Sequence, residues 1–172
     1  MTVDAERLTS TVPPGRVTHA SPPSLGVAVR LLGPVALVRA DGSAIDVPSQ
    51  TQRRLLAVLA LHRGRALRPE QLADLLDLSP GALRKVVSRL RALVGDEGLC
   101  TDALGYRLDL HVDAERFAGI ASATDPDADP SERLLELEAA LALWHGTALD
   151  EFAAEPWAQG DTTRLEELHG AA

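Results

Sequence analysis

Residues 79–95, SPGALRKVVSRLRALVG, constrain the fold more than any other stretch, because they have the pattern of an amphipathic helix with a cationic outer face. At about 100° per residue, the large aliphatic side chains fall on one arc: Leu83, Val86, Val87, Leu90, Leu93 and Val94. The opposite arc carries Arg84, Lys85, Ser88, Arg89 and Arg91, without an acidic residue among them. Ser79 suits the N-cap, Pro80 the first helical position and Gly95 a left-handed C-terminus. The pattern predicts a helix over 80–94.

The segments around this helix predict a winged helix-turn-helix. Apolar runs between 27 and 47 predict three short antiparallel strands, with a turn at Asp41-Gly42. A first helix starts with the capping-box spacing of Ser49 and Gln52 and stops near Gly64, and a second begins at Pro69. Only a few residues then precede the basic helix, which is the helix-turn-helix arrangement. Alternating residues over 99–110 predict a hairpin, or wing, after it.

The C-terminal part reads as a separate helical module. A helix is predicted from Asp113, and another starts at Asp129-Pro130 with Glu132 as the third capping-box residue. The second of these helices carries an apolar stripe that needs a partner, and we predict homodimerisation through it: Leu134, Leu137, Leu141 and Trp144. The predicted organisation is a disordered arm at 1–25, a winged-helix domain at 26–111 and a helical module at 112–172.

Charge is distributed unevenly between these parts. The net charge of the chain is −8, which argues against nucleic acid as a partner. However, residues 50–108 hold ten basic and six acidic side chains, whereas 109–172 hold three basic and fifteen acidic ones. Such asymmetry predicts two modules with different partners, although an acidic helical surface that only confers solubility would show the same composition.

Several classes of function lack their motifs here. The five histidines have no zinc-site spacing, the chain has one cysteine, and no phosphate-binding glycine loop or nucleophile elbow occurs. We therefore expect neither an enzyme nor a bound metal or cofactor. The chain also has no apolar run long enough to span a bilayer and no signal-peptide pattern at its start, so we expect a cytoplasmic protein that does not contact membranes.

Six short segments, in this order, resemble one known family: RLLGPV (30–35), QRRLLAVL (52–59), VSRLRALVG (87–95), GYRL (105–108), ALALWHG (140–146) and RLEEL (164–168). Residues 27–169 resemble transcriptional activators of the Streptomyces antibiotic regulatory protein type. The resemblance implies an α+β fold, with an OmpR-like winged helix followed by an all-α, TPR-like bacterial transcriptional activation domain that is truncated here. It also implies DNA as a partner and regulation of a secondary-metabolite gene cluster.

The chain departs from the family pattern at two further places. The loop between the second and third helices, where relatives are thought to meet RNA polymerase, is reduced to Asp77-Leu78-Ser79. The start of the basic helix, GALRKV, differs from the family's usual sequence, which implies a different base preference.

Two hypotheses follow. In the first, the protein is a sequence-specific double-stranded DNA-binding regulator, and arginine suits this role because its planar fork pairs with guanine or phosphate. The predicted base-reading residues are Arg84, Lys85, Ser88 and Arg91. The predicted phosphate contacts are Arg53, Arg54, Arg89 and Arg107. In the second hypothesis, the winged helix is a scaffold and the acidic half binds another regulator.

Overall fold

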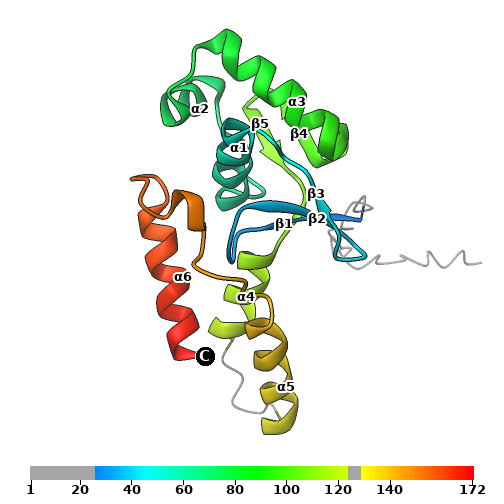
Figure 1. Ribbon diagram of the computed structural model, residues 1–172, viewed down its shortest axis with the longest axis vertical. Helices are drawn as coiled ribbons and strands as arrows, with labels where there is room; N and C mark the ends of the chain where they lie inside the picture. Colours follow the sequence, from blue (N-terminus) through cyan, green and yellow to red (C-terminus); the bar gives the residue numbers. More distant parts are fainter. Residues whose placement is uncertain (1–25, 124–128) are drawn as a thin grey trace, which may run out of the picture.

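The computed structural model describes residues 26–123 and 129–172. The predicted arm at 1–25 and residues 124–128, between the two predicted helices of the C-terminal module, lie outside these residues. In the described part, a small sheet leads into three helices and a hairpin, and further helices follow (Figure 1). The α+β class and the winged helix followed by a helical module are therefore as the sequence predicts.

The first sheet contains the three predicted antiparallel strands and one more. β1 (Val27–Arg30), β2 (Ala36–Arg39) and β3 (Ala44–Ile45) pair in sequence order. β6 (His111–Val112) joins the other edge of β1 in parallel, so that the strand order is β3-β2-β1-β6. Two residues are too few to show an alternating pattern, and the sequence does not predict this strand. β6 brings the chain back to the sheet just before the C-terminal helices begin.

Two helices form the base on which the basic helix rests. α1 (Gln50–Leu61) and α2 (Pro69–Leu76) contact each other and the third helix. Ser49 occupies the N-cap position of α1, but its side chain makes no capping hydrogen bond, so the predicted capping box there is wrong. Asp77 ends α2 in the left-handed conformation, with φ of 51°. This sharp reversal lets the third helix start after a very short connection.

The basic helix, α3 (Pro80–Gly98), starts as predicted and ends later. The Ser79 hydroxyl accepts a hydrogen bond from the Ala82 N–H at 3.3 Å, which caps the first turn. Gly95 has φ of 79°, so the regular helix breaks there and a last turn runs on to Gly98. Its inner face is buried, as the sequence predicts, through Leu83, Val87, Leu90 and Val94.

The wing follows as a two-stranded hairpin. β4 (Leu99–Asp102) and β5 (Gly105–Leu108) pair antiparallel, with Leu99 opposite Leu108. Two backbone hydrogen bonds, of 2.8 and 2.9 Å, join Leu67 to Tyr106 in both directions. The wing is therefore tied to the segment just before α2 as well as to the end of α3.

The remaining helices are α4 (Asp113–Ser122), α5 (Pro130–Leu141), the short 3-10 helix η1 (Asp150–Phe152) and α6 (Gln159–Ala171). The Asp129 carboxylate caps α5 by accepting the N–H groups of Ser131 and Glu132, and these bonds lower the pKa of Asp129. Phe117 is fully buried and makes an edge-to-face contact with Trp144, which stacks on His169 at a centroid distance of 3.9 Å. Aromatic packing thus joins α4, α6 and the segment after α5.

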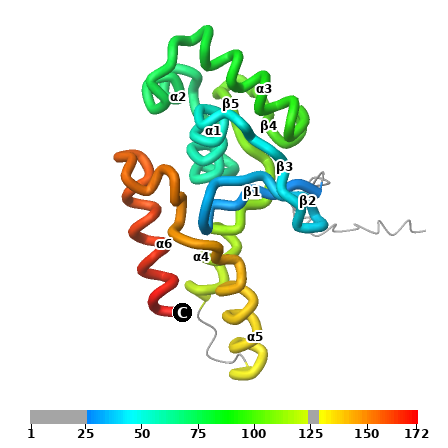
Figure 2. Tube along the Cα trace, in the orientation of Figure 1, coloured from blue at the N-terminus to red at the C-terminus, as the bar shows by residue number. Residues whose placement is uncertain are grey.

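The hydrophobic core crosses the predicted boundary at residue 111. One contiguous cluster of buried residues contains Leu55 and Leu90 of the winged helix together with Phe117, Phe152 and Leu165 of the C-terminal helices. Figure 2 shows how this is possible: after α5 the chain turns back to the level of α1 before descending again as α6. The division into 26–111 and 112–172 remains a prediction.

Backbone hydrogen bonds fasten the two parts together at Leu31 and Leu32. The Asp113 carboxylate accepts the N–H of Leu31 at 2.7 Å and that of Leu32 at 3.2 Å. The carbonyl of Leu32 accepts the N–H of His145 at 2.8 Å, and that of Leu31 accepts the N–H of Leu149 at 2.7 Å. Both peptide groups of this segment are therefore bonded to the C-terminal part of the chain.

Asp113 gives this junction a pH dependence. Burial raises the pKa of Asp113 above its ordinary value of 3.8, and the bonds from the Leu31 and Leu32 N–H groups oppose burial without cancelling it. A carboxyl group with a raised pKa holds its proton more tightly in the folded state, so its contribution to stability is largest below pH 3.8 and falls as pH rises through the folded-state pKa.

We therefore expect the free energy of unfolding of the wild type, minus that of Asp113→Asn, to decrease as pH rises above about 3.8 and then to level off. Urea unfolding of both proteins over a series of pH values measures this difference, in which the other titrating groups largely cancel. A difference that increases with pH would show that the hydrogen bonds lower the pKa of Asp113 by more than burial raises it.

Candidate nucleic-acid interface

The outer face of α3 presents a continuous exposed polar surface. Arg84, Lys85, Ser88 and Arg89 are all exposed, and together with Gly81 they line a shallow hollow of about 470 Å³. Gly81 adds no side chain to the first turns of the helix, so the start of this surface is open. In Figure 1, α3 lies at the outer edge of the molecule, away from the C-terminal helices. The structure therefore brings together four of the residues that the sequence assigned to DNA.

No side chain of the described residues neutralises the cations of this surface. Within residues 26–123 and 129–172, the side chains of Arg84, Lys85 and Arg89 take part in none of the ion pairs or hydrogen bonds. Uncompensated charges of one sign on an exposed helix create a positive potential around it, despite the net negative charge of the chain. The surface is suited to an anionic partner.

Arg91 is not part of this surface. Its Nε donates to the Leu99 carbonyl at 3.0 Å and lies 3.3 Å from a carboxylate oxygen of Asp96, and its Nη2 donates to the Thr101 hydroxyl at 2.6 Å. Residue 91 shares a helical arc with residue 84, but it lies two turns further along, where β4 folds back beside α3. The guanidinium therefore holds the wing against the helix.

Arg53 and Arg54 face the C-terminal part of the chain. Nε of Arg53 donates to both carboxylate oxygens of Glu151, at 2.9 and 3.0 Å, and its Nη1 donates to the Val47 carbonyl at 2.7 Å. The hydrogen bond to Glu151 raises the pKa of Arg53. Arg54 pairs with Glu155 at 2.8 Å. The structure does not bring these two arginines together with the outer face of α3.

Arg107, on the wing, is half-buried between two carboxylates of its own hairpin region. Its guanidinium lies 3.4 Å from Asp109 and 4.0 Å from Asp102. A phosphate contact by Arg107 would have to compete with these neighbours.

Arg68 is a basic residue of this region that the site prediction does not include. It is exposed, and it has no ion pair among the described residues. The bridge between Leu67 and Tyr106 places it beside the wing, and a Cβ at Gly105 would lie 3.0 Å from its Cα. Arg68 belongs to the locally basic segment 50–108, which the sequence shows. Its position beside the wing could not be predicted, because it depends on the pairing of Leu67 with Tyr106.

The predicted dimerisation stripe is divided between surface and core. Leu134 is 58% exposed, whereas Leu137 and Leu141 are half-buried and Trp144 packs against Phe117 and His169. The structure therefore uses the C-terminal end of the stripe inside the protomer. In the part of the chain that is described, no helix is long and apolar enough to cross a bilayer.

Comparison with known proteins gives matches over both parts of the chain. Residues 112–172 match the family model of the bacterial transcriptional activator domain. The chain is 31% identical over 150 residues to Regulatory protein AfsR of Streptomyces coelicolor, with 80% of this chain and 15% of AfsR covered. It is 30% identical over 163 residues to Transcriptional regulator RedD of the same species, with 82% of this chain and 45% of RedD covered.

A solved structure shows the same fold. Mycobacterium tuberculosis EmbR, in a complex with a low-affinity phosphopeptide, matches with a TM-score of 0.65 at 23% identity over 84% of this chain and 42% of that chain. The chain thus spans less than half the length of each of these three relatives. With a winged helix at its start and an activator domain at 112–172, the chain resembles the Streptomyces antibiotic regulatory protein type of transcriptional regulators in both of its parts.

Proposed function

We propose that this protein is a sequence-specific regulator of transcription that binds double-stranded DNA and reads the major groove with α3. The observation that carries the proposal is the exposed face of α3, on which Arg84, Lys85 and Arg89 have no ion-pair partner among the described residues. A helix fits the major groove of B-DNA, and arginine can form paired hydrogen bonds with guanine there. We assign base contacts to Arg84, Lys85 and Ser88, and a phosphate contact to Arg89.

Similarity to this family supports the wider context of this proposal. We infer that the regulated genes form a secondary-metabolite cluster, that the protein acts in the cytoplasm, and that RNA polymerase is a partner. The connection at 77–79, between α2 and α3, is the segment that would meet the polymerase if the protein activates transcription.

The salt dependence of binding tests whether the cationic face contacts phosphates. Each neutralised phosphate contributes about −0.9 to the slope of log K against log salt concentration. We expect a steep negative slope for the wild type, and a slope that is less negative by about 1 for Arg89→Ala. Fluorescence anisotropy with fragments of the neighbouring genome at several salt concentrations measures both slopes. A flat response in the wild type would contradict the proposal.

For Arg91, the contacts with the wing favour a positioning role over base reading. We expect Arg91→Ala to weaken binding to all DNA sequences by a similar factor, because the wing loses its bonds from the Arg91 guanidinium. A loss of about 1 to 3 kcal/mol confined to the cognate sequence would instead assign Arg91 to a base. Competition between cognate and mutated sites separates these outcomes.

Arg53, Arg54 and Arg107 remain proposed phosphate contacts, but weaker ones than Arg89, because each would have to exchange a carboxylate for a phosphate.

A homodimer is a further proposal, and exposed Leu134 is the residue of the stripe best placed for it. Sedimentation at high protein concentration, with Leu134→Glu as the comparison, tests the dimer.

The alternative function is a protein-interaction module. It is favoured by the pairing of Arg53 with Glu151 and of Arg54 with Glu155, which uses basic residues of the winged helix to hold the acidic half in place. In that case the chain would bind no DNA at low or moderate salt, and the partner would contact the acidic helices.

A further inference from the structure

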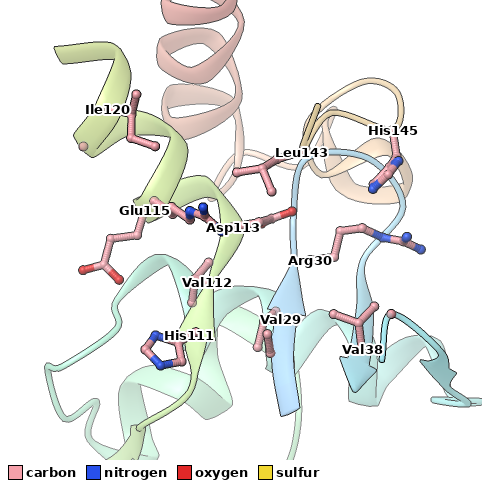
Figure 3. A pocket seen from close by; sticks show the side chains of 14 residues that line it. Val29, Arg30, Val38, His111, Val112, Asp113, Glu115, Ile120, Leu143 and His145 are labelled. Atoms are coloured by element: carbon pink, nitrogen blue, oxygen red, sulfur yellow. The ribbon is translucent and has the colours of Figure 1, made fainter. Parts of the chain in front are cut away.

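The outer face of the first sheet carries a cleft that the proposed function does not use. It has a volume of about 820 Å³ and lies between β1, β2 and β6, the helix α4 and the segment after α5 (Figure 3). Val38 of the sheet, Ile120 of α4 and Leu143 of the later segment contribute apolar side chains to its lining. The volume falls within the range of about 300 to 1,000 Å³ that is typical of small-molecule sites.

The acidic groups of the cleft are already bonded, whereas its arginines form no ion pair with the described residues. Asp113 accepts the backbone N–H groups of Leu31 and Leu32, and Glu115 pairs with Arg63. Arg30 and Arg116 also line the cleft, and neither forms an ion pair within the described residues.

Arg30 has the more unusual environment of the two arginines. Its Nε is buried and has no hydrogen-bond partner in the described part of the chain. A buried N–H of a charged group without a partner is costly, and an anionic oxygen is the strongest acceptor that could satisfy it. In Figure 3, Arg30 extends along the sheet towards His145, at the side of the cleft opposite Glu115.

We propose that this cleft binds a small amphipathic acid, with its apolar body on Val38, Ile120 and Leu143 and its carboxylate at Arg30. Arginine matches a carboxylate with two parallel hydrogen bonds, and Arg116 supplies a second positive charge in the lining. The site is separate from the outer face of α3, so the proposal does not depend on DNA binding.

Such a ligand would contact both parts of the chain at once. Arg30 directly precedes Leu31 and Leu32, whose peptide groups are bonded to Asp113, His145 and Leu149. Binding would therefore stabilise the junction between the winged helix and the activator domain.

Decanoate serves as the probe, with decanol as a neutral molecule of the same length, and calorimetry of the full chain without DNA measures binding. We expect saturable 1:1 binding of decanoate, with decanol at least about tenfold weaker. Arg30→Gln should bring decanoate close to the affinity of decanol. Val38→Trp, which fills the cleft, should weaken both molecules. Arg84→Gln, on α3, is the matched control and should leave both affinities unchanged.

Equal affinities for decanoate and decanol, or unchanged decanoate binding by Arg30→Gln, would overturn the proposal. The same holds if decanoate does not saturate, or if an acidic amphipathic peptide binds the cleft where decanoate does not. If Val38→Trp does not fold, the Arg30→Gln result decides alone, because this substitution removes the positive charge from a half-buried position of β1 and keeps a polar side chain there.

Discussion

Arg84→Ala combined with Arg89→Ala should lower the affinity for the cognate DNA site by about 100-fold or more, which corresponds to roughly 3 kcal/mol. A base contact by arginine is worth about 1 to 3 kcal/mol, and a phosphate contact adds the release of counterions. Neither side chain has an ion pair or hydrogen bond to lose within the described chain, so the fold should keep its stability. Titration of a labelled site at fixed salt gives the affinity, and thermal unfolding gives the stability.

Arg164→Ala provides a control for the loss of a positive charge outside α3. Arg164 is also an exposed arginine on a helix, but it lies on α6, where its only described ion pair is with Asp161 at 3.9 Å. The substitution removes one positive charge from the chain, where the double variant removes two, and it leaves α3 unchanged. We therefore expect less than a twofold change in affinity. A double variant on α3 that binds as tightly as the control would remove this helix from the interface.

Gly105→Ala should destabilise the fold by about 3 kcal/mol or more. A Cβ at this position would lie 2.0 Å from the Leu67 carbonyl oxygen and 2.6 Å from its carbon, and both atoms belong to backbone. Gly105 also has φ of 136°, a conformation that side chains rarely permit. Relief of the collision requires the wing to move away from Leu67, which breaks the two hydrogen bonds with Tyr106. Urea unfolding measures the loss.

Gly42→Ala separates the collision from the backbone strain. Gly42 has φ of 82°, but no atom of the described residues lies within 4 Å of a Cβ placed there. We expect it to cost only about 1 kcal/mol, the price of the left-handed conformation. If the two variants lose similar amounts of unfolding free energy, the wing can move away from Leu67 without cost and the expectation is wrong. If Gly105→Ala shows no cooperative unfolding transition, the result agrees with the expectation.

Features that depend on neighbouring residues could be predicted from the sequence. The cap at Ser79 and the break at Gly95 follow from residue types at adjacent positions, and the structure shows both. The hairpin of the wing follows from alternation over a few residues on each side of its turn. The cationic arc of α3 is also local, because helical periodicity alone places Arg84, Lys85 and Arg89 opposite the buried leucines and valines.

Features that depend on contacts between distant segments could not be predicted. The partners of Arg53 and Arg54 are about 100 positions away, and nothing near residue 53 indicates that a glutamate will reach it. Arg91 has the helical angle of a DNA-reading residue, but the position of β4 decides its contacts. The parallel strand β6 depends in the same way on where the chain returns after the wing.

The segment at Leu31 and Leu32 limits how this chain can be recombined with its relatives. A chimaera that joins this winged helix to another activator domain at residue 112 would have to supply a carboxylate in place of Asp113 and backbone donors in place of those of His145 and Leu149. Without them, two buried leucines at the junction would carry unbonded peptide groups. Exchange of a winged-helix half between such proteins therefore requires that both sides of this junction be transplanted together.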